Sequence, residues 1–208
     1  MTKKLNIALI GCGNWGKNIA RNLHEIGALG CIYDTDQSLS QKFCHDFNLP
    51  SYTINDIFKN ENIQALVIAS SAKTHKDLAE EALINNKHVL IEKPFCLSLS
   101  DANTLSELAI KKNRILMVGH LLNYHNAFIK MKNLIKEGKI GKTKNIRAHR
   151  LALGAIRSHE SVVYDLAAHD ISMILAIMQE LPVEINAHSI HHNSNIGPDA
   201  ISIKLSFK

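Results

Sequence analysis

Aromatic residues are scarce in this 208-residue chain, where Phe, Trp and Tyr together make up 5% of the sequence. Lysine and arginine outnumber the acidic residues by 24 to 19, but they are dispersed and form no basic run longer than a pair. Surfaces that bind nucleic acids usually combine a basic stripe with aromatic side chains on which bases stack. The sequence therefore argues against a nucleic-acid partner, while its net charge of +5 suits anionic small molecules.

The sequence also lacks long apolar runs and paired cysteines. No stretch approaches the roughly 20 apolar residues that a membrane-spanning helix needs, so we expect no membrane association. The spacing of the cysteines shows no C-x-x-C pattern that would indicate a metal or redox site. We expect reduced thiols and a cytoplasmic protein, with the cysteines at Cys12, Cys31, Cys44 and Cys96.

Histidines are numerous, 12 in all, yet their spacing does not predict a metal centre. The densest group is His188, His191 and His192, and strand alternation would place His188 on the face opposite His191. No cysteine or carboxylate completes a ligand set there. We therefore expect no bound metal.

A glycine-rich turn near the start of the chain carries the strongest functional signal. An apolar run at residues 5–10 predicts a strand, residues 17–26 predict a helix, and Gly11, Gly13 and Gly16 stand between them at G-x-G-x-x-G spacing. In such turns the first glycine permits the tight bend, the second lets backbone N–H groups approach a pyrophosphate, and the third allows close packing of helix and strand. The helix N-terminus then stabilises the negative charge of the phosphates.

An acidic residue follows at the distance that a dinucleotide site requires. Asp34 stands 18 residues after Gly16, at the end of a second predicted strand over residues 27–33, where a carboxylate accepts hydrogen bonds from the adenosine ribose. Thr35 comes next, and no arginine lies where it would meet a 2′-phosphate. The sequence thus predicts NAD as the cofactor rather than NADP. Asp36 could share the ribose contact, but we interpret it as a solvated turn carboxylate.

Strand and helix patterns alternate through the first 120 residues, which is typical of a doubly wound parallel sheet in an α/β fold. Continuous apolar runs predict buried strands at 65–69, 88–91 and 115–118. Thr74 and Asp77 resemble a capping box and predict the start of one helix, and a second helix is expected over 98–112. The second half predicts helices at 127–137 and within 161–181, and strands at 144–152, 183–191 and 200–207. We place two domains at residues 1–120 and 121–208.

Two further groups of residues carry candidate chemistry. Lys93 follows the strand at 88–91, at the sheet edge where such folds bind ligands, and it could hand a proton to, or take one from, an oxygen during hydride transfer. Pro94 fixes the turn and is compatible with a cis peptide bond. Read alone, Glu92 and Lys93 could instead be a surface pair.

The second group is Asp165 and His169, four residues apart on one face of a predicted helix. A histidine beside a carboxylate can act as a general base for a hydroxyl proton. The alternative is structural: Asp165 would cap the helix and His169 would belong to the core.

Together these motifs resemble the Gfo/Idh/MocA family of glucose–fructose oxidoreductase-like dehydrogenases. The resemblance implies an N-terminal Rossmann domain that binds NAD, and a C-terminal α+β domain with a mostly antiparallel sheet that covers the nicotinamide and mediates homo-oligomers. It places Lys93, Asp165 and His169 at the family's catalytic positions. The cofactor contacts that it implies are Gly11, Gly13, Asn14, Trp15, Gly16, Asp34, Ser70, Thr74, His75, Glu92 and Lys93.

A narrower likeness is carried by the segments 119–125, 150–157 and 164–170. They look like the 3-dehydrogenases of UDP-N-acetylglucosamine or its uronic acid, which leave a 3-keto sugar for surface polysaccharide biosynthesis. The implied substrate contacts are Lys93, His120, Tyr124, Arg157, Asp165 and His169. Relatives of this kind continue past Phe207 with further strands, so the resemblance implies a shortened C-terminal domain. Two alternatives stay open: a dehydrogenase of another sugar or of inositol, and a non-catalytic NAD-binding regulator on the same fold.

Overall fold

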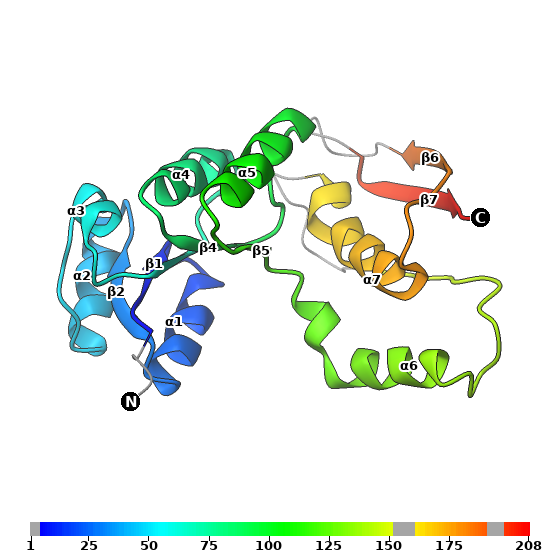
Figure 1. The fold of residues 1–208 in the computed structure, drawn as a ribbon, viewed down its shortest axis with the longest axis horizontal. Coiled ribbons are helices and arrows are strands. Elements are labelled where there is room, and N and C mark those ends of the chain that lie inside the picture. Colours follow the sequence, from blue (N-terminus) through cyan, green and yellow to red (C-terminus); the bar gives the residue numbers. More distant parts are fainter. Residues whose placement is uncertain (1–4, 152–160, 191–197) are drawn as a thin grey trace. The chain divides into compact units, whose positions relative to one another are not determined.

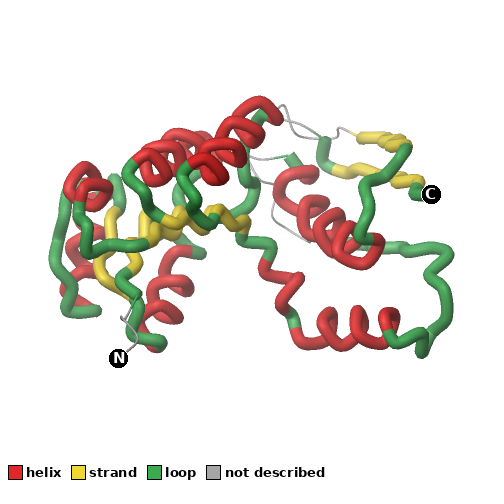
Figure 2. The backbone as a smooth tube through the Cα atoms, viewed as in Figure 1, coloured by secondary structure: helices red, strands yellow, loops and turns green. Residues whose placement is uncertain are grey.

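The computed structural model describes residues 5–151, 161–190 and 198–208 of the chain. The chain divides into two compact units, Met1–Gly119 and His120–Lys208, and each is described here by itself. Figures 1 and 2 show the order of helices and strands along the chain. The domain boundary predicted from the sequence, between residues 120 and 121, lies one residue from this division.

The N-terminal unit is built on a five-stranded parallel sheet with strand order β2-β1-β3-β4-β5. Its strands are β1 (Ile7–Ile10), β2 (Leu29–Tyr33), β3 (Ala65–Ile68), β4 (His88–Ile91) and β5 (Leu116–Val118). The helices are α1 (Gly16–Glu25), α2 (Gln37–Asp46), α3 (Ile54–Lys59), α4 (Ala72–Ile84) and α5 (Leu99–Lys111). The order reverses at β1, with β2 on one side and β3 on the other, which confirms the doubly wound α/β fold.

Both faces of this sheet are buried because apolar side chains alternate between two cores. Ala8 and Ile10 pack into one core with residues of α3, α4 and α5, whereas Leu9 packs into the other with residues of α1 and α2. The same alternation divides β3, where Leu66 and Ile68 face the first core and Val67 the second. This explains why the inner strands are continuous apolar runs in the sequence.

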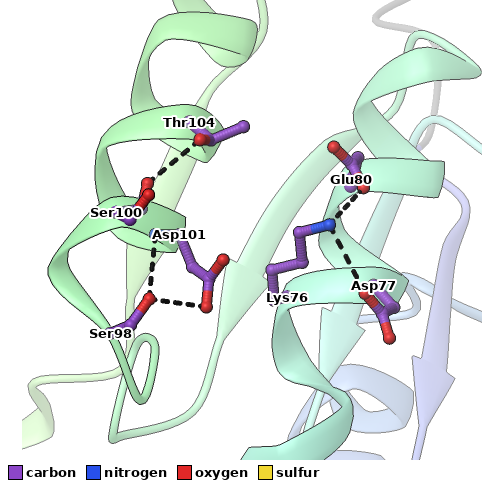
Figure 3. Close-up of polar contacts among 7 residues, drawn as sticks. All are labelled: Lys76, Asp77, Glu80, Ser98, Ser100, Asp101 and Thr104. Carbon is purple, nitrogen blue, oxygen red and sulfur yellow. Dashed lines mark hydrogen bonds and ion pairs between the residues drawn. The ribbon is translucent and has the colours of Figure 1, made fainter.

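Local sequence signals fix the starts of several helices. Ser98 caps α5: its Oγ accepts a hydrogen bond from the N–H of Asp101 at 3.1 Å and donates to Oδ2 of Asp101 at 2.7 Å (Figure 3). On α4, Lys76 bonds Glu80 one turn along, at 2.7 Å (Figure 3). The predicted start of that helix is wrong, because α4 begins at Ala72 and its N-cap residue is Ser71.

The C-terminal unit contains the 3₁₀ turn η1 (Leu121–Tyr124), helix α6 (Asn126–Lys136), the π-helical turn η2 (Val163–Ala167) and helix α7 (Ala168–Met178). Strands β6 (Glu184–Ile190) and β7 (Ala200–Ser206) form a two-stranded antiparallel sheet. The strand predicted over 144–152 is wrong for its described part, since residues 144–151 form neither a strand nor a helix. No helix in the described residues is long and apolar enough to cross a membrane.

Candidate cofactor-binding and active site

The glycine-rich turn lies between β1 and α1 and is held against the end of β3. Gly11 has a φ of +98°, and its N–H donates to the carbonyl oxygen of Tyr33 at 2.8 Å. A Cβ at Gly11 would stand 2.7 Å from backbone atoms of Ala69 and Ser70. A Cβ at Gly16 would run into the carbonyl oxygen of Gly11. Both positions therefore require glycine for reasons internal to the protein.

Gly13 differs from these two glycines. A Cβ at Gly13 would have no atom of the protein within 4 Å, so the space beside its backbone is open. The turn leads directly into α1, where the N–H groups of Lys17 and Asn18 donate to the carbonyl oxygens of Gly13 and Trp15, and the start of the helix carries the positive end of its dipole. This combination of open backbone and helix N-terminus fits a pyrophosphate, as the sequence predicts. A contact between Asn14 and the cofactor stays a prediction.

Asp34 is anchored to the glycine-rich turn. Its Oδ2 accepts a hydrogen bond from the N–H of Cys12 at 2.6 Å, and its Oδ1 accepts one from the N–H of Asp36 at 2.9 Å. Two backbone donors thus hold the carboxylate at the end of β2, beside the turn. This is the arrangement in which it can receive ribose hydroxyl groups.

Asp36 has a structural role that the sequence analysis missed. Its Oδ1 accepts hydrogen bonds from the N–H groups of Ser38 and Leu39, so it caps α2. The hydroxyl of Ser38 also donates to it, and these bonds lower the pKa of the Asp36 carboxyl. The available signal was the Asp-x-Ser pattern, which is typical of helix starts.

Cys12 lies inside the turn but is not poised for thiol chemistry. Burial, and then the negative charge of Asp34, raise the pKa of its thiol to about 12. The thiol is therefore protonated at neutral pH, and only the backbone N–H of Cys12 contributes to the site.

The loop after β3 is joined to the loop after β4 by a buried histidine. The ring of His75 is 1% exposed; its Nδ1 lies 2.8 Å from the carbonyl oxygen of Pro94 and its Nε2 lies 3.1 Å from that of Ser70. The same loop contains a hydroxyl pair, with Oγ of Ser70 2.7 Å from Oγ1 of Thr74. His75 therefore braces the backbone around Lys93, and a direct cofactor contact of its ring stays a prediction.

Glu92 connects the glycine-rich turn to the ends of β4 and β5. Its Oε1 accepts a hydrogen bond from the indole N–H of Trp15 at 2.9 Å. A Cβ at Gly119 would stand 2.9 Å from the same Oε1, so this glycine lets the carboxylate lie against the end of β5. This role of Gly119 was not predicted from the sequence, although a glycine directly after a strand is a signal of close approach. The bond between Lys93 and Pro94 is cis.

The C-terminal unit holds the second group of candidate residues. Asp165 lies in the π-helical turn η2 and His169 in the first turn of α7, so the α-helical spacing used to pair them does not apply directly. Asp165 is not a helix cap, because the residue before α7 is Ala167, and the alternative reading of Asp165 as an N-cap is wrong. Both side chains are half-buried.

Three further predicted contacts belong to this unit. Burial lowers the pKa of His120, and its Nδ1 is buried with no hydrogen-bond partner among the described residues. The side chain of Tyr124 is exposed. Arg157 lies outside the described residues. How Lys93 lies relative to Asp165 and His169 stays a prediction, since they belong to different units.

Within residues 5–151, 161–190 and 198–208, no group of three His, Cys, Asp or Glu side chains could hold a metal ion. Two of the clustered histidines, His191 and His192, lie outside those ranges.

Known proteins resemble the chain in both sequence and fold. UDP-N-acetylglucosamine 3-dehydrogenase from Acidithiobacillus ferrooxidans is 27% identical over 184 residues, which is 88% of this chain and 57% of the relative. Myo-inositol 2-dehydrogenase from Thermotoga maritima is 28% identical over 218 residues, which is 98% of this chain and 65% of the relative. The chain thus spans less than two thirds of the length of these curated relatives.

A solved structure of the Acidithiobacillus ferrooxidans enzyme shares the fold. It superposes with a TM-score of 0.86 at 24% identity, over 96% of this chain and 65% of that one. Residues 5–120 match the family described as an oxidoreductase family with an NAD-binding Rossmann fold. Because this match covers more than half of the chain, the protein belongs to the Gfo/Idh/MocA family that its motifs predict, and its N-terminal unit is the family's NAD-binding Rossmann domain.

Proposed function

We propose that this protein catalyses the NAD-dependent oxidation of a sugar hydroxyl group to a keto group. The observation that carries the proposal is the shared edge of the parallel sheet, where the open backbone at Gly13, the anchored Asp34 and the turn containing Lys93 all follow strand ends. Parallel sheets bind ligands at this edge. The matched relatives are dehydrogenases of a nucleotide sugar and of inositol, which supports a hydroxyl-bearing ring as the substrate.

In this proposal the chain's own residues bind, orient and move protons. The backbone of the glycine-rich turn and the start of α1 hold the pyrophosphate, and Asp34 accepts hydrogen bonds from the ribose. When bound, NAD supplies the acceptor for the hydride. Lys93 or His169 removes the proton of the reacting hydroxyl, and Asp165 orients His169. Burial lowers the pKa of His120, so its neutral ring can donate a hydrogen bond to, or accept one from, a sugar hydroxyl group.

The finer proposal concerns the substrate. We infer C3 of a UDP-N-acetylhexosamine or of its uronic acid, with Arg157 and Tyr124 as further contacts, because a guanidinium fork suits phosphate or carboxylate oxygens. The Acidithiobacillus ferrooxidans relative, named for this reaction, supports it. An inositol is the second candidate, because the Thermotoga maritima relative matches 98% of the chain.

The cellular setting is also a proposal. We expect the protein in the cytoplasm, in surface polysaccharide biosynthesis, and we expect homo-oligomers formed through the C-terminal sheet. The four cysteines, all free in the structure, support a reducing compartment. Light scattering of the purified protein would test the oligomer, and a monomer at all concentrations would contradict it.

NAD binding can be tested without any substrate, because Trp15 is the only tryptophan of the chain and lies in the glycine-rich turn. We expect NAD⁺ to change its fluorescence with a saturable titration curve. NADP⁺ should bind more weakly, since Asp34 would repel its 2′-phosphate. Equal binding of the two nucleotides would contradict the assigned role of Asp34.

Catalysis is tested by the appearance of NADH absorbance with NAD⁺ and each candidate: UDP-N-acetylglucosamine, its uronic acid and myo-inositol. We expect turnover with one of the first two, and loss of turnover in Lys93→Ala with the Trp15 titration still measurable. Lys111→Ala, a lysine at the end of α5, is the matched control and should leave turnover unchanged. Binding of NAD without turnover of any candidate would contradict the catalytic proposal and favour a non-catalytic regulator.

A further inference from the structure

The N-terminal unit contains a cavity of about 470 Å³ at the edge of the parallel sheet opposite the glycine-rich turn. Residues at the starts of three neighbouring strands line it: Gln64 precedes β3, Lys87 precedes β4, His88 begins β4, and Arg114 lies shortly before β5. The proposed cofactor site lies at the carboxyl ends of the strands, so this cavity is separate from it. Its volume is within the range of small-molecule sites, about 300–1,000 Å³.

Lys87 brings a buried positive charge to this cavity. The residue is 5% exposed, and its Nζ donates to the carbonyl oxygens of Asn60 at 2.7 Å and Ile63 at 2.8 Å. An ammonium group has three protons, so one donor remains beyond these two bonds. Burial lowers the pKa of Lys87, and the negative charge of Glu61 opposes this shift only in part. A bound anion would stabilise the buried ammonium group.

Two neighbouring side chains carry further donors without acceptors. The Nε of Arg114 is buried and has no hydrogen-bond partner among the described residues. The Nδ1 of His88 accepts a hydrogen bond from the N–H of Ile115 at 3.0 Å, so the neutral ring carries its proton on Nε2, which no described residue bonds. Because buried donors such as the Nε of Arg114 are rarely left unpaired, this set of donors indicates a ligand with several acceptor oxygens.

The helix ends at this edge are already satisfied by the protein itself. Helix α4 ends beside the cavity, and the last carbonyl groups of a helix would repel an anion if they had no donors. Here the carbonyl oxygen of Leu83 accepts from the N–H of Asn86 at 3.0 Å, and that of Ile84 accepts from Nζ of Lys112 at 3.0 Å. The unused donors of the cavity are therefore not needed to satisfy these carbonyl groups.

The charges of the lining indicate the class of ligand. Lys59, Lys87 and Arg114 are cationic and Glu61 is the only carboxylate of the described lining, which leaves two net positive charges when His88 is neutral. A phosphate monoester has a second pKa of about 6, so it is mainly a dianion at neutral pH, and it presents three acceptor oxygens. A carboxylate offers one charge and two oxygens, and it matches the lining less well.

We propose that this cavity binds the phosphate group of a small organic phosphate. Lys87, His88 and Arg114 donate to the phosphate oxygens, because charge-assisted hydrogen bonds of this kind are strong. Ile84, which is exposed on the wall of the same cavity, contacts the organic part of the ligand. Inorganic phosphate shares the chemistry of the phosphate group but lacks this apolar contact.

The test is calorimetric titration of the full chain at pH 7.5 with phenyl phosphate, inorganic phosphate and benzoate. We expect one phenyl phosphate to bind per chain, at least about tenfold more tightly than benzoate, with inorganic phosphate between them. Benzoate binding as tightly as phenyl phosphate would contradict the phosphate class. Inorganic phosphate binding as tightly as phenyl phosphate would overturn the organic ligand in favour of free phosphate.

Substitutions then assign the binding to this cavity. Arg114→Gln should weaken phenyl phosphate binding about tenfold, and Lys59→Gln, at an exposed position of the lining, should weaken it about threefold without affecting the fold. Arg21→Gln on α1, exposed and outside the lining, is the matched control and should change nothing. Gly13→Ala should also leave this binding unchanged, because it alters only the glycine-rich turn.

Two results would overturn the proposal outright. One is the absence of binding by either phosphate compound, and the other is binding that Gly13→Ala removes while Arg114→Gln and Lys59→Gln retain it. Neither result depends on NAD or on turnover of a sugar, so a failure of this proposal is distinguishable from a failure of the proposed enzymatic function.

Discussion

Alanine substitutions at two glycines of the same turn should have different effects: Gly11→Ala should lower stability, whereas Gly13→Ala should weaken cofactor binding. Gly11 has a φ of +98°, and its added Cβ would stand 2.7 Å from the backbone of Ala69 and Ser70. Gly13 would gain a Cβ with no protein atom within 4 Å. Gly11→Ala therefore perturbs the fold itself, whereas Gly13→Ala changes only the surface offered to a ligand.

The magnitudes follow from these geometries. Backbone strain of this kind costs about 1–3 kcal/mol, and relief of the Cβ overlap would require the end of β3 to move, so we expect Gly11→Ala to lose about 3 kcal/mol of unfolding free energy. For Gly13→Ala we expect a change within about 0.5 kcal/mol. Its methyl group would occupy the space that a pyrophosphate needs, and NAD binding should weaken at least about tenfold, or about 1.4 kcal/mol.

Both quantities can be measured with one reporter, the fluorescence of Trp15. Urea unfolding reports the stability of the N-terminal unit, and titration with NAD⁺ reports the dissociation constant. Normal stability and normal NAD binding in Gly13→Ala would refute the assignment of the turn as the pyrophosphate site. A Gly11→Ala protein as stable as the parent would refute the strain argument.

Three other substitutions or conditions test neighbouring features. Asp34→Asn should weaken NAD binding about tenfold and raise the preference for NADP, because charge-assisted bonds contribute about 1.5–3 kcal/mol; parallel fluorescence titrations would show it. His75→Ala removes the ring that bridges the carbonyl oxygens of Pro94 and Ser70, and it leaves at least one of them without its donor. We expect a loss of about 1–3 kcal/mol in urea unfolding, with His75→Gln intermediate; equal stability would contradict its bracing role. The pKa values of Cys12 and Cys31 are raised from 9.0 to about 12, so both folded thiols keep their protons longer than the unfolded chain does. Unfolding free energy should be unaffected below pH 9 and fall between about pH 9 and 12, with both thiols inert to alkylating reagents until the protein unfolds; rapid labelling of the folded protein would contradict this.

The sequence predicts the inner strands closely because burial on both faces leaves a continuous apolar run. The strand at 88–91 agrees with β4 residue by residue, and that at 65–69 with β3 to within one residue. Helices α2 and α3 were not predicted, since their polar composition hides the apolar face. Their caps were the readable signal: Thr53 and Asp56 form a capping box at the start of α3.

The candidate site divides in the same way between local and distant information. The glycine spacing and Asp34 are local patterns, and in the structure Asp34 is bonded to the N–H of Cys12 within the glycine-rich turn. The bond from Trp15 to Glu92 joins residues 77 apart, and the contacts of His75 join two loops. No spacing rule predicts such contacts, because they depend on which strands become neighbours in the sheet.

The same reasoning explains why the strand expected at 144–152 fails while β6 and β7 succeed. A strand requires a hydrogen-bonded neighbour, and β6 and β7 provide one for each other within a short stretch of chain. Residues 144–151 pair with no described strand. The success at β6 and β7 and the failure at 144–152 therefore have one physical cause: a sequence pattern favours a strand, but a partner within hydrogen-bonding reach decides whether one forms.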